Sequence, residues 1–469
     1  MTSIEAVDTT NPDQPRWQQG ELVEVEITDL SDSGDGVGRS DQRVVFVPDT
    51  VTGDRAIVRL LRVKPTFARG KLHQLLQPSP HRIRPRCIVA DKCGGCQWQH
   101  VSDAYQRAAK YNQVVQALKR IGGLPYPPVD PVLQRGDTLS YRNKVTYPLG
   151  RSVTGQVQAG YYQKHSHQLV NLNQCPIQDD RLNPLLAAIK QDIAQRGWSI
   201  YNEQKHRGNL RHLGFRMGRH TGEVLLLLVA CNWDLPELEQ QAQIWLQRYP
   251  ALAGVVLNRN PDRTNTILGP ESRCIAGRPY LRERFLDLTL QIGPDTFFQV
   301  NTEQAEVLVQ VVLDELALQG RETVLDAYCG IGTLTLPLAQ QAQRVVGIEV
   351  QPAAIDQALQ NAQLNGIQNV VFEVGAVEQV LPQLEWLPDV VILDPPRRGC
   401  DAQVIQTLRQ MQPARIVYVS CNPATLARDL KLLSDGQTYE VQRIQPVDLF
   451  PQTAHVECVA FLSQRQPLV

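Results

Sequence analysis

The pattern of hydrophobic and polar positions divides the chain into stretches with different periods. From Glu21 onward, short alternating segments (ELVEVEITDL, RVVFVP and RAIVRLLRVK) are separated by Gly- and Asp-containing turns. Alternation with a period of two predicts strands with one buried face, and their spacing predicts a small antiparallel β-barrel over residues 17–77. Barrels of the OB type bind nucleic acid on one face, although a purely structural barrel would give the same pattern. Residues 1–16 are polar and lack periodicity, so we expect them to be disordered.

A second stretch begins after the proline-rich linker PSPHRIRPRC, whose prolines disfavour both helix and strand pairing. Further strands are predicted at SYRNKVTYPL, QVQAGYY, EVLLLLVA and AGVVLNRN. These segments favour a mixed α+β central domain over residues 78–285, whose topology the pattern does not define.

Over residues 286–469 strand and helix patterns alternate regularly. Strands are predicted at TVLDAY, RVVGIEV, VVFEV, DVVILD and RIVYVS, with helices such as PAAIDQALQNAQLN between them. This alternation predicts an α/β domain with a doubly wound, Rossmann-like parallel sheet. The last two strands, YEVQRIQPVD and HVECVAFLSQ, have no helix between them and should form a terminal hairpin. Such a hairpin separates a methyltransferase sheet from a plain dinucleotide-binding sheet.

Composition and charge add a prediction about the partner. A chain of 469 residues with 42% hydrophobic positions can form three domains, and its net charge is only −1. The charge is nevertheless segregated, because Arg55 to Ala90 holds nine Arg or Lys residues and no acid. A second acid-free stretch, Gln204 to Gly222, holds Lys205, Arg207, Arg211, Arg216 and Arg219. Either stretch alone could be a solvated face, but the two together favour binding to RNA or DNA.

Two features of the sequence predict a cytoplasmic protein. The first residues, MTSIEAVDTT, lack a basic segment followed by an apolar one, and the longest apolar run, Val224 to Cys231, is too short to span a bilayer. We therefore expect no membrane association, and no obligate protein partner is evident.

Four of the ten cysteines form a candidate metal site. Cys87, Cys93 and Cys96 are clustered, and the distant Cys175 is followed by Pro176. In a reducing compartment such clusters more often bind metal than form disulfides. Zinc accepts four thiolates, whereas the uneven spacing and the final Cys-Pro resemble iron-sulfur ligation. The spacing alone leaves both metals open.

A candidate cofactor site follows the first strand of the α/β domain. Asp326 begins the turn DAYCGIGT, whose glycines allow the backbone to approach a ligand closely. Glu349, at the end of the second strand, is placed to accept hydrogen bonds from a ribose diol. Asp394, in the sequence DPPR, follows a later strand and lies at the same edge of the sheet. An adenosine-type ligand is therefore predicted at this edge.

Cys421 is the candidate nucleophile. It lies at the end of the strand RIVYVS and directly before a helix, a position that favours the thiolate. A thiolate that adds to C6 of a uracil makes C5 nucleophilic, and a base must afterwards remove the proton from C5. Glu457, in the last strand, is the candidate base, although an edge-strand carboxylate without a catalytic role fits as well. Gln299, in FFQVN, is an amide that can both donate and accept hydrogen bonds.

Five motifs occur along the chain in the order FFQVN, LDAYCGIGTL, ILDPPRRG, VYVSCNP and HVEC. Together they resemble the RNA uracil-5-methyltransferase family, especially its branch that acts on bacterial 23S ribosomal RNA. The segment DGVGRSDQRVVFVPDTVTGD resembles the TRAM domain of that branch. Two positions depart from the family pattern, because Cys458 stands where Thr is expected and Ala327 where Leu is usual. Cys458 adjoins the candidate base and could change its packing.

The resemblance implies a class I methyltransferase fold and a definite set of site residues. S-adenosylmethionine would contact Gln299, Tyr328, Glu349 and Asp394, Cys421 would be the nucleophile and Glu457 the base. The cysteines at 87, 93, 96 and 175 would hold a 4Fe-4S cluster.

The leading hypothesis is thus a methyltransferase that forms 5-methyluridine in a structured RNA, expected to be 23S ribosomal RNA. We prefer ribosomal over transfer RNA because the chain has both the barrel and the four cysteines. The alternatives are methylation of uridine 54 in transfer RNA, C5 methylation of cytosine in RNA, and a non-catalytic iron-sulfur RNA-binding protein.

Overall fold

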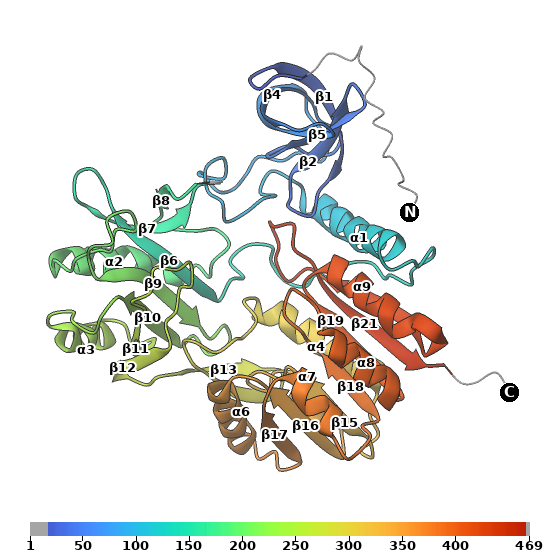
Figure 1. The fold of residues 1–469 in the computed structure, drawn as a ribbon. Helices are drawn as coiled ribbons and strands as arrows, with labels where there is room; N and C mark the ends of the chain where they lie inside the picture. The colour runs from blue at the N-terminus through green and yellow to red at the C-terminus, as the bar shows by residue number, and fades with distance from the viewer. Residues whose placement is uncertain (1–16, 165, 466–469) are drawn as a thin grey trace, which may run out of the picture. The chain divides into compact units, whose positions relative to one another are not determined.

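The computed structural model of the protein describes residues 17–164 and 166–465, and these divide into two compact units (Figure 1). One unit comprises the chain up to Arg84 together with His100–Ser102, and the other comprises Pro85–Gln99 and the chain from Asp103 onward. The predicted disorder of residues 1–16 falls outside the described residues. None of the helices in the described part is long and apolar enough to cross a membrane.

The first unit is a closed barrel with strand order β1-β2-β3-β5-β4. The alternation in β1 buries Val23, Val25 and Ile27 inside the barrel, as the period of two predicts. All neighbouring strands pair antiparallel except β3 and β5, which run parallel. The predicted barrel is therefore confirmed, with one parallel pair added. Its strands are β1 (Leu22–Leu30), β2 (Gly36–Ser40), β3 (Arg43–Val47), β4 (Arg55–Val63) and β5 (Phe67–Gln77).

The second unit contains a seven-stranded mixed sheet with order β12-β11-β10-β9-β6-β7-β8. Every residue of β10 is buried, because α2 and α3 cover one face of the sheet and the apolar core of the C-terminal region covers the other. The strands are β6 (Lys144–Arg151), β7 (Val157–Tyr162), β8 (Leu169–Asn171), β9 (Leu210–Met217), β10 (Val224–Ala230), β11 (Leu252–Arg259) and β12 (Glu271–Gly277), and the helices are α2 (Leu182–Gln195) and α3 (Leu238–Arg248).

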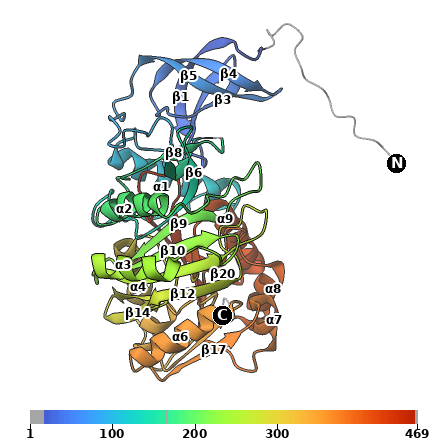
Figure 2. The ribbon, with the colours of Figure 1, turned by 90° about the vertical axis from the view of Figure 1, so that its left-hand side faces the viewer.

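The C-terminal region is built on a second seven-stranded sheet with order β17-β16-β15-β18-β19-β21-β20 (Figures 1 and 2). The first five strands are parallel, and β21 lies antiparallel between β19 and β20, which confirms the predicted terminal hairpin. The strands are β15 (Thr323–Ala327), β16 (Arg344–Glu349), β17 (Val370–Val374), β18 (Val390–Leu393), β19 (Arg415–Ser420), β20 (Tyr439–Val447) and β21 (Glu457–Gln464); a separate hairpin, β13 (Leu281–Phe285) and β14 (Leu288–Ile292), precedes them.

Helices cover both faces of this sheet. On one face α4, α5 and α6 pack over an apolar core, and on the other α7, α8 and α9 pack together with α1. This arrangement explains the buried apolar strands and leaves the carboxyl ends of the parallel strands open to form a site. The helices are α1 (Asp103–Arg120), α4 (Thr302–Leu316), α5 (Thr335–Ala339), α6 (Pro352–Leu364), α7 (Val377–Val380), α8 (Ala402–Met411) and α9 (Pro423–Ser434).

Helix α1 comes early in the sequence but packs on the C-terminal sheet. Its Val114 and Leu118 are fully buried in an apolar core that also contains residues of α8 and α9. The ammonium of Lys110 donates to Asp448 Oδ1 at 2.6 Å and to the carbonyl of Phe450 at 3.0 Å. Because both charged side chains are buried, loss of either would leave the other charge without compensation.

Candidate active site

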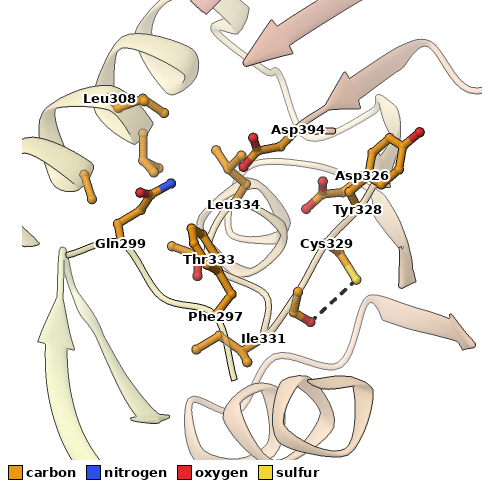
Figure 3. Close-up of a pocket in the computed structure, with 13 residues that line it drawn as sticks. Phe297, Gln299, Leu308, Asp326, Tyr328, Cys329, Ile331, Thr333, Leu334 and Asp394 are labelled. Atoms are coloured by element: carbon orange, nitrogen blue, oxygen red, sulfur yellow. Dashed lines mark hydrogen bonds between the residues drawn. The ribbon is translucent and has the colours of Figure 1, made fainter. Parts of the chain in front are cut away.

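A pocket opens at the carboxyl end of β15, where the glycine-rich turn begins (Figure 3). Tyr328 adopts a left-handed backbone conformation with φ of 72°, as do Gly330 and Gly332 with φ of 56° and 88°. A left-handed tyrosine is strained, and such strain is often found where backbone is shaped around a ligand. The pocket is lined by Phe297, Gln299, Ala305, Leu308, Val309, Asp326, Tyr328, Cys329, Gly330, Ile331, Thr333, Leu334 and Asp394.

Two carboxyl groups face this pocket. Oδ2 of Asp326 accepts a hydrogen bond of 2.5 Å from the hydroxyl of Thr335, whereas its buried Oδ1 has no hydrogen-bond partner among the described residues. Burial raises the pKa of Asp326 to about 7, and burial likewise raises the pKa of Asp394 to about 7. An unsatisfied buried carboxyl oxygen is costly unless a ligand donates to it.

Glu349 occupies the neighbouring strand end, as predicted. Its Oε2 accepts from the amide of Gly330 at 3.2 Å, and its Oε1 accepts from the amide of Gln351 at 2.9 Å. The carboxylate therefore ties the second strand to the glycine turn. It is not among the side chains that line the pocket, although it lies against the turn that forms the pocket wall.

The strand register brings Cys421 and Glu457 together. Ser420 pairs with Cys458 in the antiparallel ladder of β19 and β21, so the next positions along each strand, Cys421 and Glu457, are opposite each other. Glu457 is buried at 3% exposure, and Cys421 is half-buried before α9. Asn422 caps that helix by accepting from the amide of Ala424 at 3.0 Å.

The electrostatics of this pair differ from the sequence prediction. Burial, and then the charge of Glu457, raise the pKa of Cys421, while Arg397 lowers it. Burial and Asp394 raise the pKa of Glu457 well above its usual value, again opposed by Arg397. The net shift of the Cys421 pKa is therefore upward, because desolvation and the neighbouring carboxylates outweigh the groups that favour the thiolate.

Sequence reasoning did not assign a role to Arg397. Its carbonyl accepts from Asn422 Nδ2 at 3.2 Å and from the hydroxyl of Thr425 at 3.3 Å, which fixes the DPPR turn to the start of α9. The guanidinium is exposed and is the cation that favours ionisation of both Cys421 and Glu457. The signal in the sequence was the position of this arginine, directly after Asp394-Pro-Pro at the strand end.

Comparisons with known proteins agree with this geometry. Residues 282–465 match the family model described as tRNA (Uracil-5-)-methyltransferase, and residues 16–73 match the TRAM domain. An uncharacterized RNA methyltransferase of Nostoc sp. is 67% identical over 446 residues, covering 95% of this chain and 97% of the relative. The chain belongs to the RNA uracil-5-methyltransferase family. It is thus an RNA methyltransferase.

A solved structure from this family resembles nearly the whole chain. The crystal structure of Pyrococcus abyssi tRNA (uracil-54, C5)-methyltransferase in complex with S-adenosyl-L-homocysteine matches with a TM-score of 0.76 and 31% identity. The match covers 94% of this chain and 99% of that chain. Because this match to a transfer RNA enzyme covers nearly the full length, domain organisation by itself does not distinguish a ribosomal from a transfer RNA methyltransferase. The preference for ribosomal RNA therefore stays a prediction.

The segment that carries Gln299 in this methyltransferase is fixed by a residue of the other sheet. Asn143, which directly precedes β6, is buried at 1% exposure. Its Nδ2 donates to the carbonyl of Gln299 and to the hydroxyl of Thr302, both at 2.9 Å, and its backbone amide donates to the carbonyl of Val300 at 2.8 Å. The central sheet thus holds the segment that leads from the pocket into α4.

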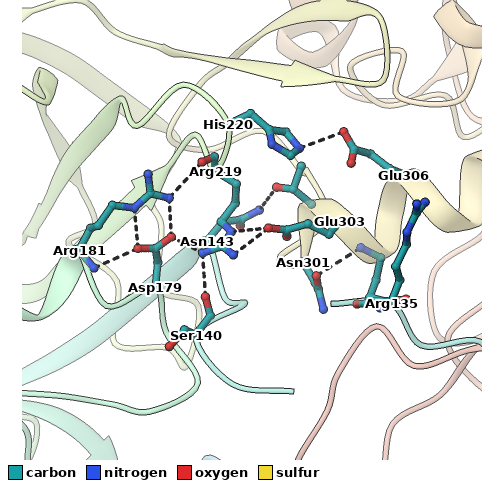
Figure 4. Close-up of polar contacts among 12 residues, drawn as sticks. Arg135, Ser140, Asn143, Asp179, Arg181, Arg219, His220, Asn301, Glu303 and Glu306 are labelled. Atoms are coloured by element: carbon teal, nitrogen blue, oxygen red, sulfur yellow. Dashed lines mark hydrogen bonds and ion pairs between the residues drawn. The ribbon is translucent and has the colours of Figure 1, made fainter. Parts of the chain in front are cut away.

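A wider polar network reinforces this connection (Figure 4). Arg219 donates from Nε and Nη2 to Glu303 Oε1 at 2.9 and 2.7 Å, and it also binds Asp179. Its backbone amide and that of His220 donate to the fully buried Glu283. The network joins the central sheet, the β13–β14 hairpin and the first turn of α4.

This arrangement corrects part of the charge interpretation. Of the five cations between Gln204 and Gly222, only Lys205 and Arg207 are exposed. Arg211 is buried and donates from Nη1 to the carbonyls of Asn260 and Asp262 at 2.8 and 2.7 Å. Arg211 and Arg219 are engaged in hydrogen bonds and ion pairs within the protein, so the prediction that this whole stretch is an RNA-binding face is wrong.

The other basic stretch is different, because the cations of the barrel strands β4 and β5 are exposed. These are Arg55, Arg59, Arg62, Arg69 and Lys71.

The structure brings the four predicted metal ligands around one pocket. Cys87, Cys93, Cys96 and Cys175 all line it, together with Tyr161 and other mainly apolar side chains. Among the described residues no group of three or more His, Cys, Asp or Glu side chains is arranged to hold a metal ion. The four thiols are thus neighbours, and the iron-sulfur cluster stays a prediction.

Proposed function

We propose that this RNA methyltransferase transfers a methyl group from S-adenosylmethionine to C5 of a uridine, through a covalent adduct between Cys421 and C6. The observation that carries the proposal is the register of β19 and β21, which sets Cys421 opposite Glu457 at the sheet edge where the pocket opens. A nucleophile and a base side by side are the two groups that this reaction requires.

The residues of the pocket fit S-adenosylmethionine. The unsatisfied Oδ1 of Asp326 can accept from a donor of the ligand, and Gln299 and Asp394 present polar groups to the same cavity. Leu308 and Leu334 provide apolar surface for the adenine ring. When bound, S-adenosylmethionine supplies an activated methyl group on a positively charged sulfur, which the carboxyl groups would attract.

The chain's own residues then account for the remaining chemistry. The sulfur of Cys421, after losing its proton, forms a bond to C6, and the electron pair of the C5–C6 double bond becomes available at C5. C5 then takes the methyl group from the sulfonium; the electron pair of the broken sulfur–methyl bond stays on that sulfur, and S-adenosylhomocysteine leaves. Glu457 removes the proton from C5, the double bond re-forms, and the bond between sulfur and C6 breaks to release Cys421.

Cofactor affinity should depend on pH because Asp326 and Asp394 have raised pKa values. Both carboxyls have a pKa of about 7, so they are mostly protonated at pH 6 and mostly ionised at pH 8. Only the ionised form attracts a cation, and we expect S-adenosylmethionine to bind about tenfold more tightly at pH 8 than at pH 6. Isothermal titration at both pH values measures this. The double variant Asp326→Asn, Asp394→Asn retains the cofactor's own titration and should lose most of the difference; an unchanged pH response in that variant would contradict the assignment.

Asn143 should affect the cofactor from outside the pocket. In Asn143→Ala the carbonyl of Gln299 and the hydroxyl of Thr302 lose their donor, so the Gln299 segment becomes less ordered. We expect the dissociation constant for S-adenosylmethionine to rise about tenfold. The matched control is Asn258→Ala, another buried asparagine of the same sheet, whose Nδ2 donates to the carbonyls of Gly269 and Glu271. The control should lower thermal stability without changing cofactor affinity; equal losses of affinity in both variants would refute the positioning role.

Product analysis tests the proposed reaction. The purified protein is incubated with S-adenosylmethionine carrying a labelled methyl group and with unmodified 23S ribosomal RNA or transfer RNA transcripts. The RNA is then digested to nucleosides for mass analysis. We expect labelled 5-methyluridine, whereas labelled 5-methylcytidine would replace the proposal with cytosine methylation. The absence of labelled nucleoside from both RNAs and from total cellular RNA would contradict it.

The choice of RNA has two candidates. The resemblance of the motifs to the 23S branch supports ribosomal RNA, and the full-length similarity to the Pyrococcus abyssi enzyme supports uridine 54 of transfer RNA. We propose 23S ribosomal RNA as the substrate and keep transfer RNA as the second candidate. Comparing the initial rates on the two transcripts decides between them.

We further propose that Cys87, Cys93, Cys96 and Cys175 hold a 4Fe-4S cluster. The support is that all four thiols line one mainly apolar pocket, and four cysteine thiolates are the ligand set of a 4Fe-4S cluster. When present, the cluster would link the segment around Cys93 to the loop of Cys175. It belongs to the central sheet and would support RNA positioning without taking part in methyl transfer.

Metal analysis of protein purified without oxygen tests this assignment. We expect about four iron and four acid-labile sulfide per chain, and Cys175→Ser should lower both. The control Cys231→Ser removes a half-buried thiol of the same unit and should leave the iron content unchanged. A protein with one zinc and no sulfide would show the zinc alternative to be correct.

A further inference from the structure

Two cations face each other on neighbouring strands of the central sheet. Lys144 on β6 and Arg216 on β9 are register partners in the antiparallel ladder, so their side chains leave the same face of the sheet. Both line a small pocket together with Thr146, Leu225 and Pro294. Like charges directly opposite each other destabilise a sheet, so the presence of two cations at these positions requires an explanation.

Neither cation forms an ion pair with a carboxylate of the described residues. Arg216 is buried at 4% exposure, and its Nε and Nη1 have no hydrogen-bond partner in the described part of the chain. Its Nη2 donates only to the carbonyl of Thr296, at 2.7 Å. Lys144 is half-buried, and its side-chain ammonium makes no hydrogen bond or ion pair to any described residue.

The charges around the pair leave a positive excess. Arg142 is a further nearby cation, whose Nε donates to the carbonyl of Lys144 at 2.9 Å, and the nearby carboxylate is that of Asp295, which is exposed. The Arg216 charge, then burial, lower the pKa of Lys144 to about 7, and burial lowers the pKa of Arg216 to about 10. A buried pair of cations without a counter-charge raises the free energy of the folded protein, and binding of an anion between them lowers it.

The pair lies beside the active site. Leu225 and Leu227, which line the same pocket, belong to the apolar core shared with the C-terminal sheet. Through the carbonyl of Thr296, Arg216 holds the segment that continues directly into Phe297 and Gln299 of the cofactor pocket. A ligand on Lys144 and Arg216 is therefore next to the segment that shapes the catalytic site.

We propose that Lys144 and Arg216 form a binding site for a phosphodiester group of the RNA substrate, close to the nucleotide that is methylated. A phosphate that enters the pocket offers several acceptor oxygens to the ammonium of Lys144 and to the guanidinium of Arg216, whose buried Nε and Nη1 have no partner among the described residues, and its charge offsets theirs. The inference rests on the proposed function, since it assumes RNA as the substrate. It adds a defined contact that places the RNA backbone against the central sheet.

The test compares Arg216→Met and Lys144→Met in the full-length protein. Binding of an unmodified 23S ribosomal RNA transcript is measured at several salt concentrations, and S-adenosylmethionine binding and the thermal midpoint are measured in parallel. Each variant should bind the RNA at least about tenfold more weakly and show a salt slope smaller by about 0.7 to 0.9. The thermal midpoint should stay or rise, because an uncompensated charge has been removed from the interior.

Arg211→Met provides the matched control. Arg211 lies on the same strand, but its guanidinium donates to three backbone carbonyls. This variant should lower the thermal midpoint and leave the salt slope unchanged. The second variant, Lys144→Met, keeps the test decisive if Arg216→Met fails to fold.

The outcomes separate this inference from the proposed function. If the wild type forms 5-methyluridine but both Met variants keep the wild-type salt slope, the phosphate site is refuted and the proposed function stands. If the variants lose cofactor affinity and keep RNA affinity, the cation pair serves the carboxylate of S-adenosylmethionine, and the inference is again wrong. If the wild type forms no 5-methyluridine on any RNA, the proposed function itself has failed.

Discussion

Replacing Cys421 with alanine should abolish methylation while leaving cofactor binding intact. Cys421 supplies the bond to C6 that makes C5 nucleophilic, and no other described thiol lies opposite Glu457 in the strand register. We expect the rate of 5-methyluridine formation to fall by at least about 10⁴-fold, as for the loss of other covalent nucleophiles. The affinity for S-adenosylmethionine should stay within about twofold, because the side chain does not line the cofactor pocket.

RNA that contains 5-fluorouridine tests the same prediction, because the covalent protein-RNA complex can then be detected by gel electrophoresis. Fluorine at C5 cannot be removed as a proton is, so the wild-type protein should remain covalently attached to the RNA, and Cys421→Ala should not. The exposed Cys274 provides the control, since Cys274→Ala removes a thiol on β12, remote in sequence from the proposed site, and should behave as the wild type. An adduct that persists in Cys421→Ala would assign the nucleophile to another residue.

Replacing Glu457 with glutamine should have the opposite effect on the covalent complex. Without a base the C5 proton stays in place after methyl transfer, and the bond between Cys421 and C6 cannot break. We expect turnover to fall by about 10² to 10⁴-fold while a protein-RNA adduct accumulates on ordinary uridine RNA, where the wild type shows none. Denaturing gel electrophoresis with labelled RNA, together with the steady-state rate, measures both effects.

The hairpin that carries Glu457 also contains its control. Glu440 is an exposed carboxylate on β20, and Glu440→Gln changes the same functional group without entering the site. It should turn over normally and accumulate no adduct. If Glu457→Gln loses activity but leaves no adduct, Glu457 is needed before the bond to C6 forms and is not the base that removes the C5 proton.

The raised pKa values of Cys421 and Glu457 give these reactions a common pH dependence. Both groups act in their deprotonated forms, and burial raises the pKa of each. The rate of the wild type should therefore rise with pH from the acidic side. Arg397 opposes both shifts, so Arg397→Gln should move the rise to higher pH.

Local patterns predicted those parts of the fold whose neighbours are close in sequence. The period of two in β1 and the strand-helix alternation after Leu286 depend on which face is buried, so the barrel and the doubly wound sheet could be recognised. Strand β9 was missed because Arg211 and Arg216 belong to an acid-free basic stretch of the sequence. Burial of those side chains is decided by acceptors that are far away in the sequence, such as the carbonyls of Asn260 and Thr296.

By itself the sequence determined the chemistry that this methyltransferase has available. It placed Asp394 and Cys421 at strand ends and Glu457 in a terminal hairpin, because the carboxyl ends of parallel strands share one edge. Only the tertiary structure set Cys421 opposite Glu457, raised their pKa values by burial and left Lys144 and Arg216 side by side without an ion pair to any described residue. Register, desolvation and hydrogen-bond satisfaction depend on which distant segments pack together, and no local pattern of residues contains that information.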